Sequence, residues 1–114
     1  MRIWDISPSF LCRKHLLGEH RELHAIWSVI TQNKKGYSKH PETIRWVGKL
    51  KALHMRHQEL VNEMKKRGYT HASDLPARYA RGKAHQDVFI HSIDEQVAIL
   101  KQKGCLCFSV IPKK

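Results

Sequence analysis

Residues 41–68 read PETIRWVGKLKALHMRHQELVNEMKKRG, a stretch in which one set of positions recurs at steps of three and four residues. That period predicts a long amphipathic helix that begins at Pro41 and buries one face. Gly68 predicts its end, since glycine suits the left-handed conformation after a helix and the preceding cations suit the helix dipole. We expect this helix to be the central packing element. The recurring positions are Trp46, Leu50, Leu53, His57, Leu60 and Met64.

A first helix is predicted upstream, from about Pro8 to Gln32. Ser7 and Pro8 favour its start, because serine can accept from the first amides and proline is tolerated at the first helical position. Residues 33–37 are turn formers and open a basic loop that reaches Lys39. An apolar stripe at helical spacing predicts the face that packs into the core. The stripe comprises Leu16, Leu23, Trp27 and Ile30.

The rest of the chain predicts one more helix. Residues 69–91 contain Pro76 and Gly82 and little periodicity, so we expect a mostly irregular basic segment across the surface. Ser92–Glu95 match a capping box, which predicts a helix to about Lys103 that Gly104 stops. No internal repeat or linker is evident. The predicted fold is all-α, a single compact domain of residues 1–114 with three principal helices.

The composition is strongly basic. Lys and Arg number 21 against 10 Asp and Glu, a formal charge of +11 with the nine histidines neutral. Such an excess favours a polyanionic partner, either as the substrate of an enzyme or as the target of a noncatalytic phosphate-binding module. Charge alone does not separate these two classes.

The cellular location is predicted from two features that the sequence does not contain, a membrane-spanning run and a secretion signal. The sequence contains no apolar run of about 20 residues and no apolar core of a secretion signal near Met1, so we expect a cytoplasmic protein, nucleoid-associated if bacterial, that does not bind membranes. Three cysteines, Cys12, Cys105 and Cys107, form no even disulfide framework, which suits that location. Cys105 and Cys107 are a weak metal signal, and we interpret them as packed or exposed thiols.

Three groups of residues resemble a known family. Arg2-Ile3 stands near the start of the chain, His15-Leu16 lies about one turn before the motif Glu19-x-Arg21-Glu22-Leu23, and Asp94-Glu95 opens the third predicted helix. In these positions the chain resembles the pyrimidine-dimer DNA glycosylases. Further matches on the second helix are Lys49-Leu50, Leu53, Arg56, Glu59-Leu60, Glu63 and Lys66-Arg67-Gly68-Tyr69.

The resemblance implies DNA repair by a glycosylase with abasic-site lyase activity, cyclobutane pyrimidine dimers being the leading lesion. It assigns the nucleophile to the α-amine of Met1 and the essential acid to Glu22. The chemistry is sound, because an α-amine with a pKa of about 7.7–8.0 is partly neutral near pH 7. Arg2 is too bulky for the usual removal of the initiator methionine, so we expect Met1 to be retained.

Candidate DNA contacts surround these two residues. We expect Arg2 and Arg21 to bind phosphates that flank the lesion, and His15 to contact a phosphate or tune the nearby carboxylates. Trp4 is a candidate for DNA contact, whereas helical spacing places Trp27 and Trp46 in the core. Further candidates are Lys14, His20, Lys34 and Lys35.

Alternatives remain at this stage. Glu19, Arg21 and Glu22 can instead form a solvated, salt-bridged helix face. His15, His20 and His24 share a spacing that suggests a metal site, but no closed ligand set accompanies them, so we expect no metal and no cofactor. Ser92, Gln96 and Ala25 stand where the family has basic residues, so other damaged bases or abasic sites alone are alternative substrates. The expected partner is damaged double-stranded DNA, bound by a monomer.

Overall fold

The structure is a computed structural model that describes residues 3–32, 35–36, 39–69 and 74–103. The fold is all-α, as predicted, and three principal helices, α1 (Arg13–Thr31), α3 (Leu50–Lys66) and α4 (Ile93–Gln102), contain most of the helical residues. Two short 3-10 turns, η1 (Pro8–Phe10) and η2 (Ala77–Tyr79), and a single-turn helix, α2 (Pro41–Ile44), complete the elements. The described residues contain no β-strand, only an isolated bridge between Lys49 and Gly82.

The first predicted helix begins later than expected. Pro8 opens the 3-10 turn η1, Leu11 then adopts an extended conformation (φ −83°, ψ 138°), and α1 starts at Arg13. The Ser7 hydroxyl pairs with that of Ser9 at 3.0 Å and does not cap a helix. The break lets Leu11 turn inward, where it is fully buried.

The second predicted helix is interrupted. It begins at Pro41 as expected, but α2 ends at Ile44 and α3 starts only at Leu50. Gly48 adopts φ +77° between them, a conformation that does not continue a right-handed helix. The predicted end is confirmed, because Gly68 takes φ +82° and the Tyr69 amide donates to the carbonyl of Met64.

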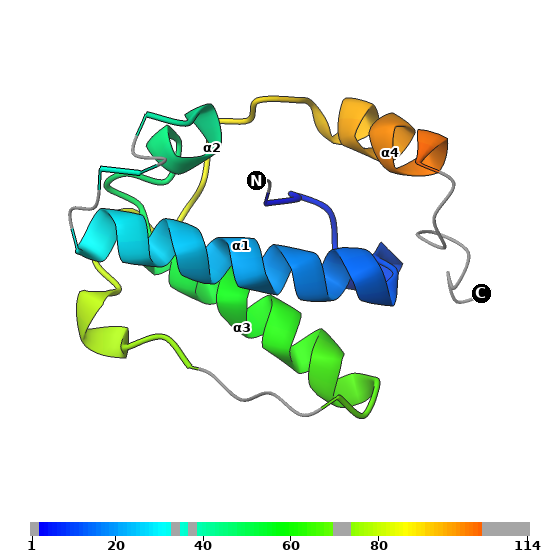
Figure 1. Ribbon diagram of the computed structural model, residues 1–114, viewed down its shortest axis with the longest axis horizontal. Helices are drawn as coiled ribbons and strands as arrows, with labels where there is room; N and C mark the ends of the chain where they lie inside the picture. Colours follow the sequence, from blue (N-terminus) through cyan, green and yellow to red (C-terminus); the bar gives the residue numbers. More distant parts are fainter. Residues whose placement is uncertain (1–2, 33–34, 37–38, 70–73, 104–114) are drawn as a thin grey trace.

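The core lies between α1 and α3, which cross in Figure 1 and make the largest interhelical contact. Both apolar stripes face it, and Trp27 and Trp46 are buried there as predicted. The N-terminal segment, residues 3–6, passes between α1 and α4 in Figure 1 and adds three buried side chains. These are Ile3, Trp4 and Ile6.

The segment from Asp74 to His91 is mostly irregular, as predicted, but is attached at defined points. The carbonyls of Arg81 and Lys83 accept from the amides of Lys51 and Ala52 in the first turn of α3. The capping box of α4 is also confirmed, since the Ser92 hydroxyl accepts from the Glu95 amide and the Glu95 carboxylate from the Ser92 amide. Among the described residues, no helix is long and apolar enough to cross a bilayer.

Candidate active site

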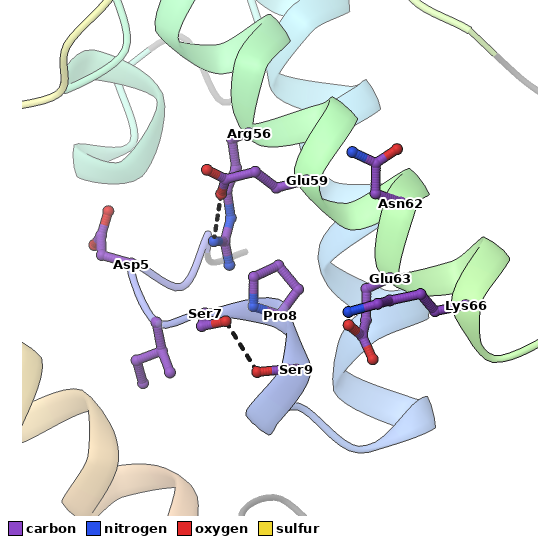
Figure 2. A pocket seen from close by; sticks show the side chains of 10 residues that line it. Asp5, Ser7, Pro8, Ser9, Arg56, Glu59, Asn62, Glu63 and Lys66 are labelled. Atoms are coloured by element: carbon purple, nitrogen blue, oxygen red, sulfur yellow. Dashed lines mark hydrogen bonds and ion pairs between the residues drawn. The ribbon is translucent and has the colours of Figure 1, made fainter. Parts of the chain in front are cut away.

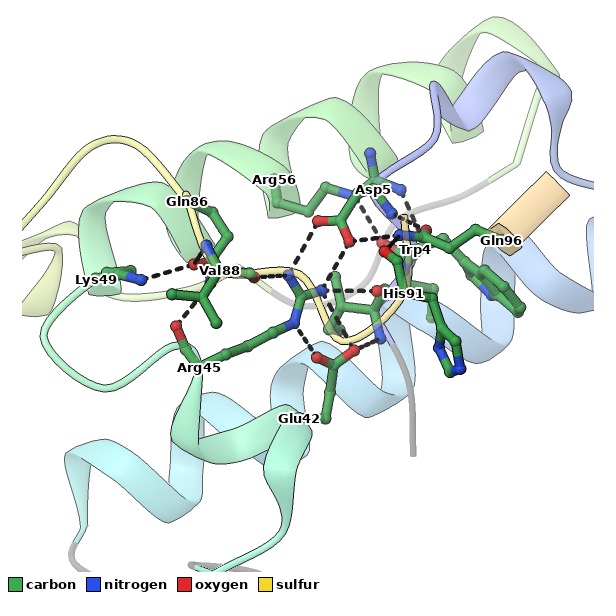
Figure 3. A network of polar contacts seen from close by, with 12 residues as sticks. Trp4, Asp5, Glu42, Arg45, Lys49, Arg56, Gln86, Val88, His91 and Gln96 are labelled. Carbon is green, nitrogen blue, oxygen red and sulfur yellow. Dashed lines mark hydrogen bonds and ion pairs between the residues drawn. The ribbon is translucent and has the colours of Figure 1, made fainter. Parts of the chain in front are cut away.

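The backbone of the N-terminal segment is bound by two buried carboxylates. The Trp4 amide donates to Glu19 Oε1 at 3.1 Å, and the Ile3 amide donates to Glu42 Oε1 at 2.5 Å. Glu19 belongs to α1 and Glu42 to α2, and each is 2% exposed. Because both acceptors are side chains of helices, the positions of α1 and α2 determine where Ile3 and Trp4 lie (Figure 3).

Each carboxylate is held by an arginine. Arg56 of α3 donates to Glu19 through Nε at 2.6 Å and Nη2 at 3.0 Å, a bidentate pair. Arg45 binds Glu42, and its Nη2 also donates to the Ile3 carbonyl at 2.9 Å. Buried charged side chains therefore bind both N–H and C=O groups of the N-terminal segment, which we call the anchored segment.

Burial and pairing act in opposite directions on the Glu19 carboxyl. Burial raises the pKa of Glu19 above its ordinary value, while the charge and hydrogen bonds of Arg56 and the Trp4 amide oppose that rise. Burial also acts to lower the pKa of Arg56, but the Glu19 carboxylate outweighs it and the Arg56 pKa is raised. Arg56 therefore stays charged, and its two N–H donors need the carboxylate form of Glu19.

The side chain of Glu22 is less buried than that of Glu19 and differs from it in its ion pairing, although both residues belong to the same motif. It lies three residues further along α1, which places the two side chains on neighbouring positions of one face. Its side chain is only partly buried, and no ion pair joins it to another residue of the described ranges. The alternative, a solvated salt-bridged face of Glu19, Arg21 and Glu22, does not form, because Glu19 is buried and pairs with Arg56 of α3. Glu22 thus carries a carboxylate, three residues after Glu19 on α1, that forms no ion pair with the described residues.

Asp5 connects the same region to α4. Its carboxylate accepts from Arg45 Nη1 at 3.1 Å and from Gln96 Nε2 at 3.0 Å, and its amide donates to Gln96 Oε1 at 2.8 Å. Arg45 Nη1 also donates to the carbonyl of Val88 at 2.9 Å. Gln96 is 2% exposed, and its side chain joins α4 to the N-terminal segment.

His15 lies one turn before Glu19 on α1. Its Nδ1 is 3.2 Å from the thiol of Cys12, and its ring meets that of Trp4 edge-on at 6.0 Å. Burial lowers the pKa of His15 below its ordinary value, and the nearby charges of Lys103 and Lys14 lower it further. His15 is therefore held neutral beside the anchored segment.

The predicted DNA contacts fall into three groups. Lys14, Arg21 and Lys35 are exposed, and His20 is partly exposed. Trp4 is 4% exposed within the core, so its burial does not support the predicted stacking on DNA. The remaining predicted residues, Met1, Arg2 and Lys34, lie outside the described ranges, as do Cys105 and Cys107.

Several residues of this region were not recognised in the sequence as site residues. In the sequence, Arg56 is only a match to the resembled family and Gln96 only a departure from it, and neither Glu42 nor Arg45 belongs to a recognised motif. The one local signal is the opposite charge of Glu42 and Arg45 at i and i+3, which usually marks a surface pair. Pairing of Glu19 with Arg56 spans 37 residues and could not be inferred from spacing.

The histidines are grouped differently from the sequence pattern. His20 and His24 lie together on α1, but their neighbour is His57 of α3, whereas His15 is turned toward Trp4. The Nε2 atom of His24 is 3.2 Å from that of His20 and 3.2 Å from that of His57. This cluster is a second polar feature of the interface between α1 and α3.

A shallow groove of about 750 Å³ runs between the N-terminal segment and α3 (Figure 2). Three carboxylates line it, those of Asp5, Glu59 and Glu63, together with the cations of Arg56 and Lys66. Arg56 is already paired with Glu19 and Glu59. Because Asp5, Glu59 and Glu63 are each paired with an arginine, the groove offers a polyanion little net positive charge, and phosphate is better accommodated by the exposed cations elsewhere.

Comparison with known protein families gives a match that covers most of the residues of this site. A family model described as pyrimidine dimer DNA glycosylase matches residues 1–77, which include the anchored segment, α1, α2 and α3. No curated protein and no solved structure matches the chain. The family match covers well over half of the 114 residues. The chain belongs to the pyrimidine dimer DNA glycosylase family, whose members are DNA repair glycosylases.

Proposed function

We propose that this protein is a DNA glycosylase with abasic-site lyase activity whose substrate is the cyclobutane pyrimidine dimer. The observation that carries the proposal is the attachment of the Ile3 and Trp4 amides to Glu42 and Glu19. Met1 precedes Ile3 by two residues, a reach of at most about 7 Å. We propose that its α-amine acts together with Glu22, which follows Glu19 by three residues on α1.

The α-amine of Met1 is the proposed nucleophile. Near pH 7 an ordinary α-amine is partly neutral, unlike a lysine, so it can attack carbon without a special environment. The neutral amine attacks the sugar C1′ as the bond from C1′ to the base breaks, and the departing base takes up a proton that the attacking nitrogen loses. The electron pair left on nitrogen then forms the C1′=N bond as the bond from C1′ to O4′ breaks and O4′ takes up a proton from solvent. An imine protonated on nitrogen now joins the enzyme to the opened sugar.

Glu22 has two proposed roles in sequence. Its carboxylate stabilises the positive charge that develops on the sugar while the base departs. It then removes a proton from C2′, and the electron pair expels the 3′ phosphate by β-elimination. The products are a base no longer bonded to its sugar and a strand nicked on the 3′ side of that sugar, and hydrolysis of the imine returns the free amine. Glu19 cannot replace Glu22 in these steps, because both of its oxygens are bound to Arg56.

The exposed cations supply the proposed contacts to DNA. Arg21 adjoins Glu22, and Lys14 and Lys35 lie on or after α1, so these side chains can bind phosphates around the lesion. Family resemblance further implies that the duplex is bent and a nucleotide displaced, since the target atoms are otherwise inside the stack.

Borohydride trapping tests the covalent step. The protein is incubated with duplexes that contain one thymine dimer or one abasic site, reduced, and mapped by peptide mass spectrometry, and an intact mass establishes whether Met1 is present and unblocked. We expect an adduct at Met1 with both duplexes. An adduct with abasic DNA alone would retain the lyase and exclude the dimer as substrate, and no adduct with either would favour a noncatalytic DNA-binding module.

Glu22→Gln separates catalysis from binding. We expect single-turnover strand cleavage to fall by at least about 100-fold, the usual contribution of a general acid or base, while duplex binding is retained. Glu59→Gln is the matched control, because it removes one exposed carboxylate from α3 and changes the net charge equally. Cleavage by Glu22→Gln at the rate of Glu59→Gln would contradict the assignment.

A further inference from the structure

Three imidazoles converge between α1 and α3. His20 and His24 are one turn apart on α1, and His57 of α3 faces them and is fully buried. Nε2 of His24 lies 3.2 Å from Nε2 of His20 and 3.2 Å from Nε2 of His57. The three rings have centroids 4.6–5.1 Å apart, and one nitrogen from each lies within 4.8 Å of the others.

Hydrogen bonds between the rings do not account for this arrangement. An imidazole nitrogen carries either one N–H or one lone pair in the plane of the ring. His24 Nε2 can therefore make one hydrogen bond of normal geometry, yet two other Nε2 atoms approach it at the same distance. A cation bound to all three lone pairs removes that conflict.

The distances suit a transition metal. A nitrogen ligand of tetrahedral zinc is about 2.0–2.1 Å from the ion, which puts two such ligands roughly 3.3 Å apart. Two of the three nitrogen pairs already have nearly this separation. Imidazole ligands favour zinc, cobalt, nickel or copper over magnesium or calcium, which prefer oxygen.

We propose that His20, His24 and His57 bind one divalent first-row transition ion, with Zn²⁺ the leading candidate and a water molecule as the fourth ligand. Two ligands from α1 and one from α3 would join the two main helices of the core. His20 and His24 also bracket Glu22, so the ion would fix the helical turn that carries the proposed catalytic carboxylate. The binding test below does not depend on the proposed function.

The experiment uses the full chain without a histidine tag, stripped with EDTA and titrated with Zn²⁺ against a chromophoric indicator. We expect one equivalent to bind and to raise the Tm by roughly 10 °C when free Zn²⁺ is 100 times the Kd. In His20→Gln and His24→Gln the affinity should fall by more than the roughly 10–100-fold that loss of an outer-shell partner costs. The exposed His85→Gln variant is the matched control and should bind as the wild type does.

Cobalt gives a readout that needs no variant. Co²⁺ added to the stripped wild-type protein should produce the visible absorption of a tetrahedral site, and should shift the NMR resonances of His20, His24 and His57 more than those of His85. Because the cobalt measurement uses the wild-type protein, it remains informative if a substitution in the cluster prevents folding. Far-UV circular dichroism of each stripped variant shows whether that variant is folded. Absence of stoichiometric binding to the wild type, or equal loss of affinity in His24→Gln and His85→Gln, would overturn the proposal.

Discussion

Two glutamates of one motif have different environments, and that difference divides their roles. Glu19 is buried, bound to Arg56 and to the Trp4 amide, whereas Glu22 three residues later is partly exposed. Both oxygens of Glu19 accept from Arg56 inside the core, so this carboxylate cannot approach a substrate, whereas the partly exposed carboxylate of Glu22 can. Tertiary contacts, rather than residue type, leave Glu22 for chemistry.

Arg56→Met tests the anchor. The substitution leaves the Glu19 carboxylate buried without its cation, which should lower the free energy of unfolding by about 3–5 kcal/mol in urea denaturation. Glu19→Gln combined with Arg56→Met should recover part of that loss, because the amide oxygen can still accept from Trp4 and no unpaired charge remains. A loss below about 1 kcal/mol for Arg56→Met would show that the pair does not hold the segment.

His15 should titrate below its ordinary pKa of 6.5, since burial and then the charges of Lys103 and Lys14 disfavour its cation. The unfolded chain takes up this proton more readily, so the contribution of His15 to stability is complete above about pH 6.5 and is lost as the pH falls through the lower folded-state pKa. NMR of the imidazole measures the midpoint directly. Lys103→Gln should move it upward, and an unchanged midpoint would mean that Lys103 does not act on His15.

The junction between α2 and α3 depends on two glycines that face one another. Gly82 adopts φ +86°, and the Cβ of any other residue there would lie 2.1 Å from the carbonyl oxygen of Gly48. Because the two glycines are so close, the backbone amide of Lys83 donates to the same Gly48 oxygen at 3.0 Å. Lys49 then reaches Gln86 and Asp87, at 2.8 and 2.9 Å. The irregular segment after η2 therefore stays against the start of α3.

Gly82→Ala should destabilise the protein by at least about 2 kcal/mol, because the new methyl group meets backbone and the left-handed conformation is strained for alanine. Gly18→Ala is the matched control: Gly18 is in the middle of α1, and nothing lies within 4 Å of an added Cβ. That variant should be more stable by about 0.5–1 kcal/mol. Thermal unfolding of the two variants measures both changes in stability. If Gly82→Ala and Gly18→Ala changed the stability by similar amounts in the same direction, the close approach of Gly82 to Gly48 would be refuted.

The excess charge of the protein is distributed unevenly. Within the described ranges, the cations of Arg45, Lys49 and Arg56 form ion pairs that join different parts of the chain. Arg67 pairs with Glu63 at the end of α3 and donates to the carbonyls of Pro8 and Leu11. Most other cations there are exposed, including Arg21 and Lys14 on α1. Carboxylates gather in the groove beside α3. Counterion release on binding DNA should therefore come from the surface cations and not from the paired ones.

Salt dependence of DNA binding checks this division. The logarithm of the association constant should fall linearly with the logarithm of salt concentration, and Arg21→Gln should reduce that slope by about 0.9, the value for one phosphate contact. Lys66→Gln removes the same charge from the carboxylate-lined groove and should leave the slope unchanged. Equal changes in both variants would place DNA over the groove as well.

The helices themselves were largely predictable. The spacing of apolar residues predicted the buried faces of α1 and α3. The capping residues Ser92 and Gly68 predicted the start of α4 and the end of α3. These signals are readable in the sequence because they act within a few residues. The interruptions at Leu11 and Gly48 were missed. Each is imposed by packing or by contact with a distant segment, which no local pattern records.

Sequence alone established the all-α class, the basic surface and the family motif around Glu22, since these rest on composition and short-range order. Only the folded chain decided which charges are buried. Glu19 meets Arg56 across 37 residues and Asp5 meets Gln96 across 91, and such pairings follow from helix packing. Packing also replaced His15 with His57 as the neighbour of His20 and His24. Spacing along one helix specifies a face, whereas a site is completed by whichever element packs against that face.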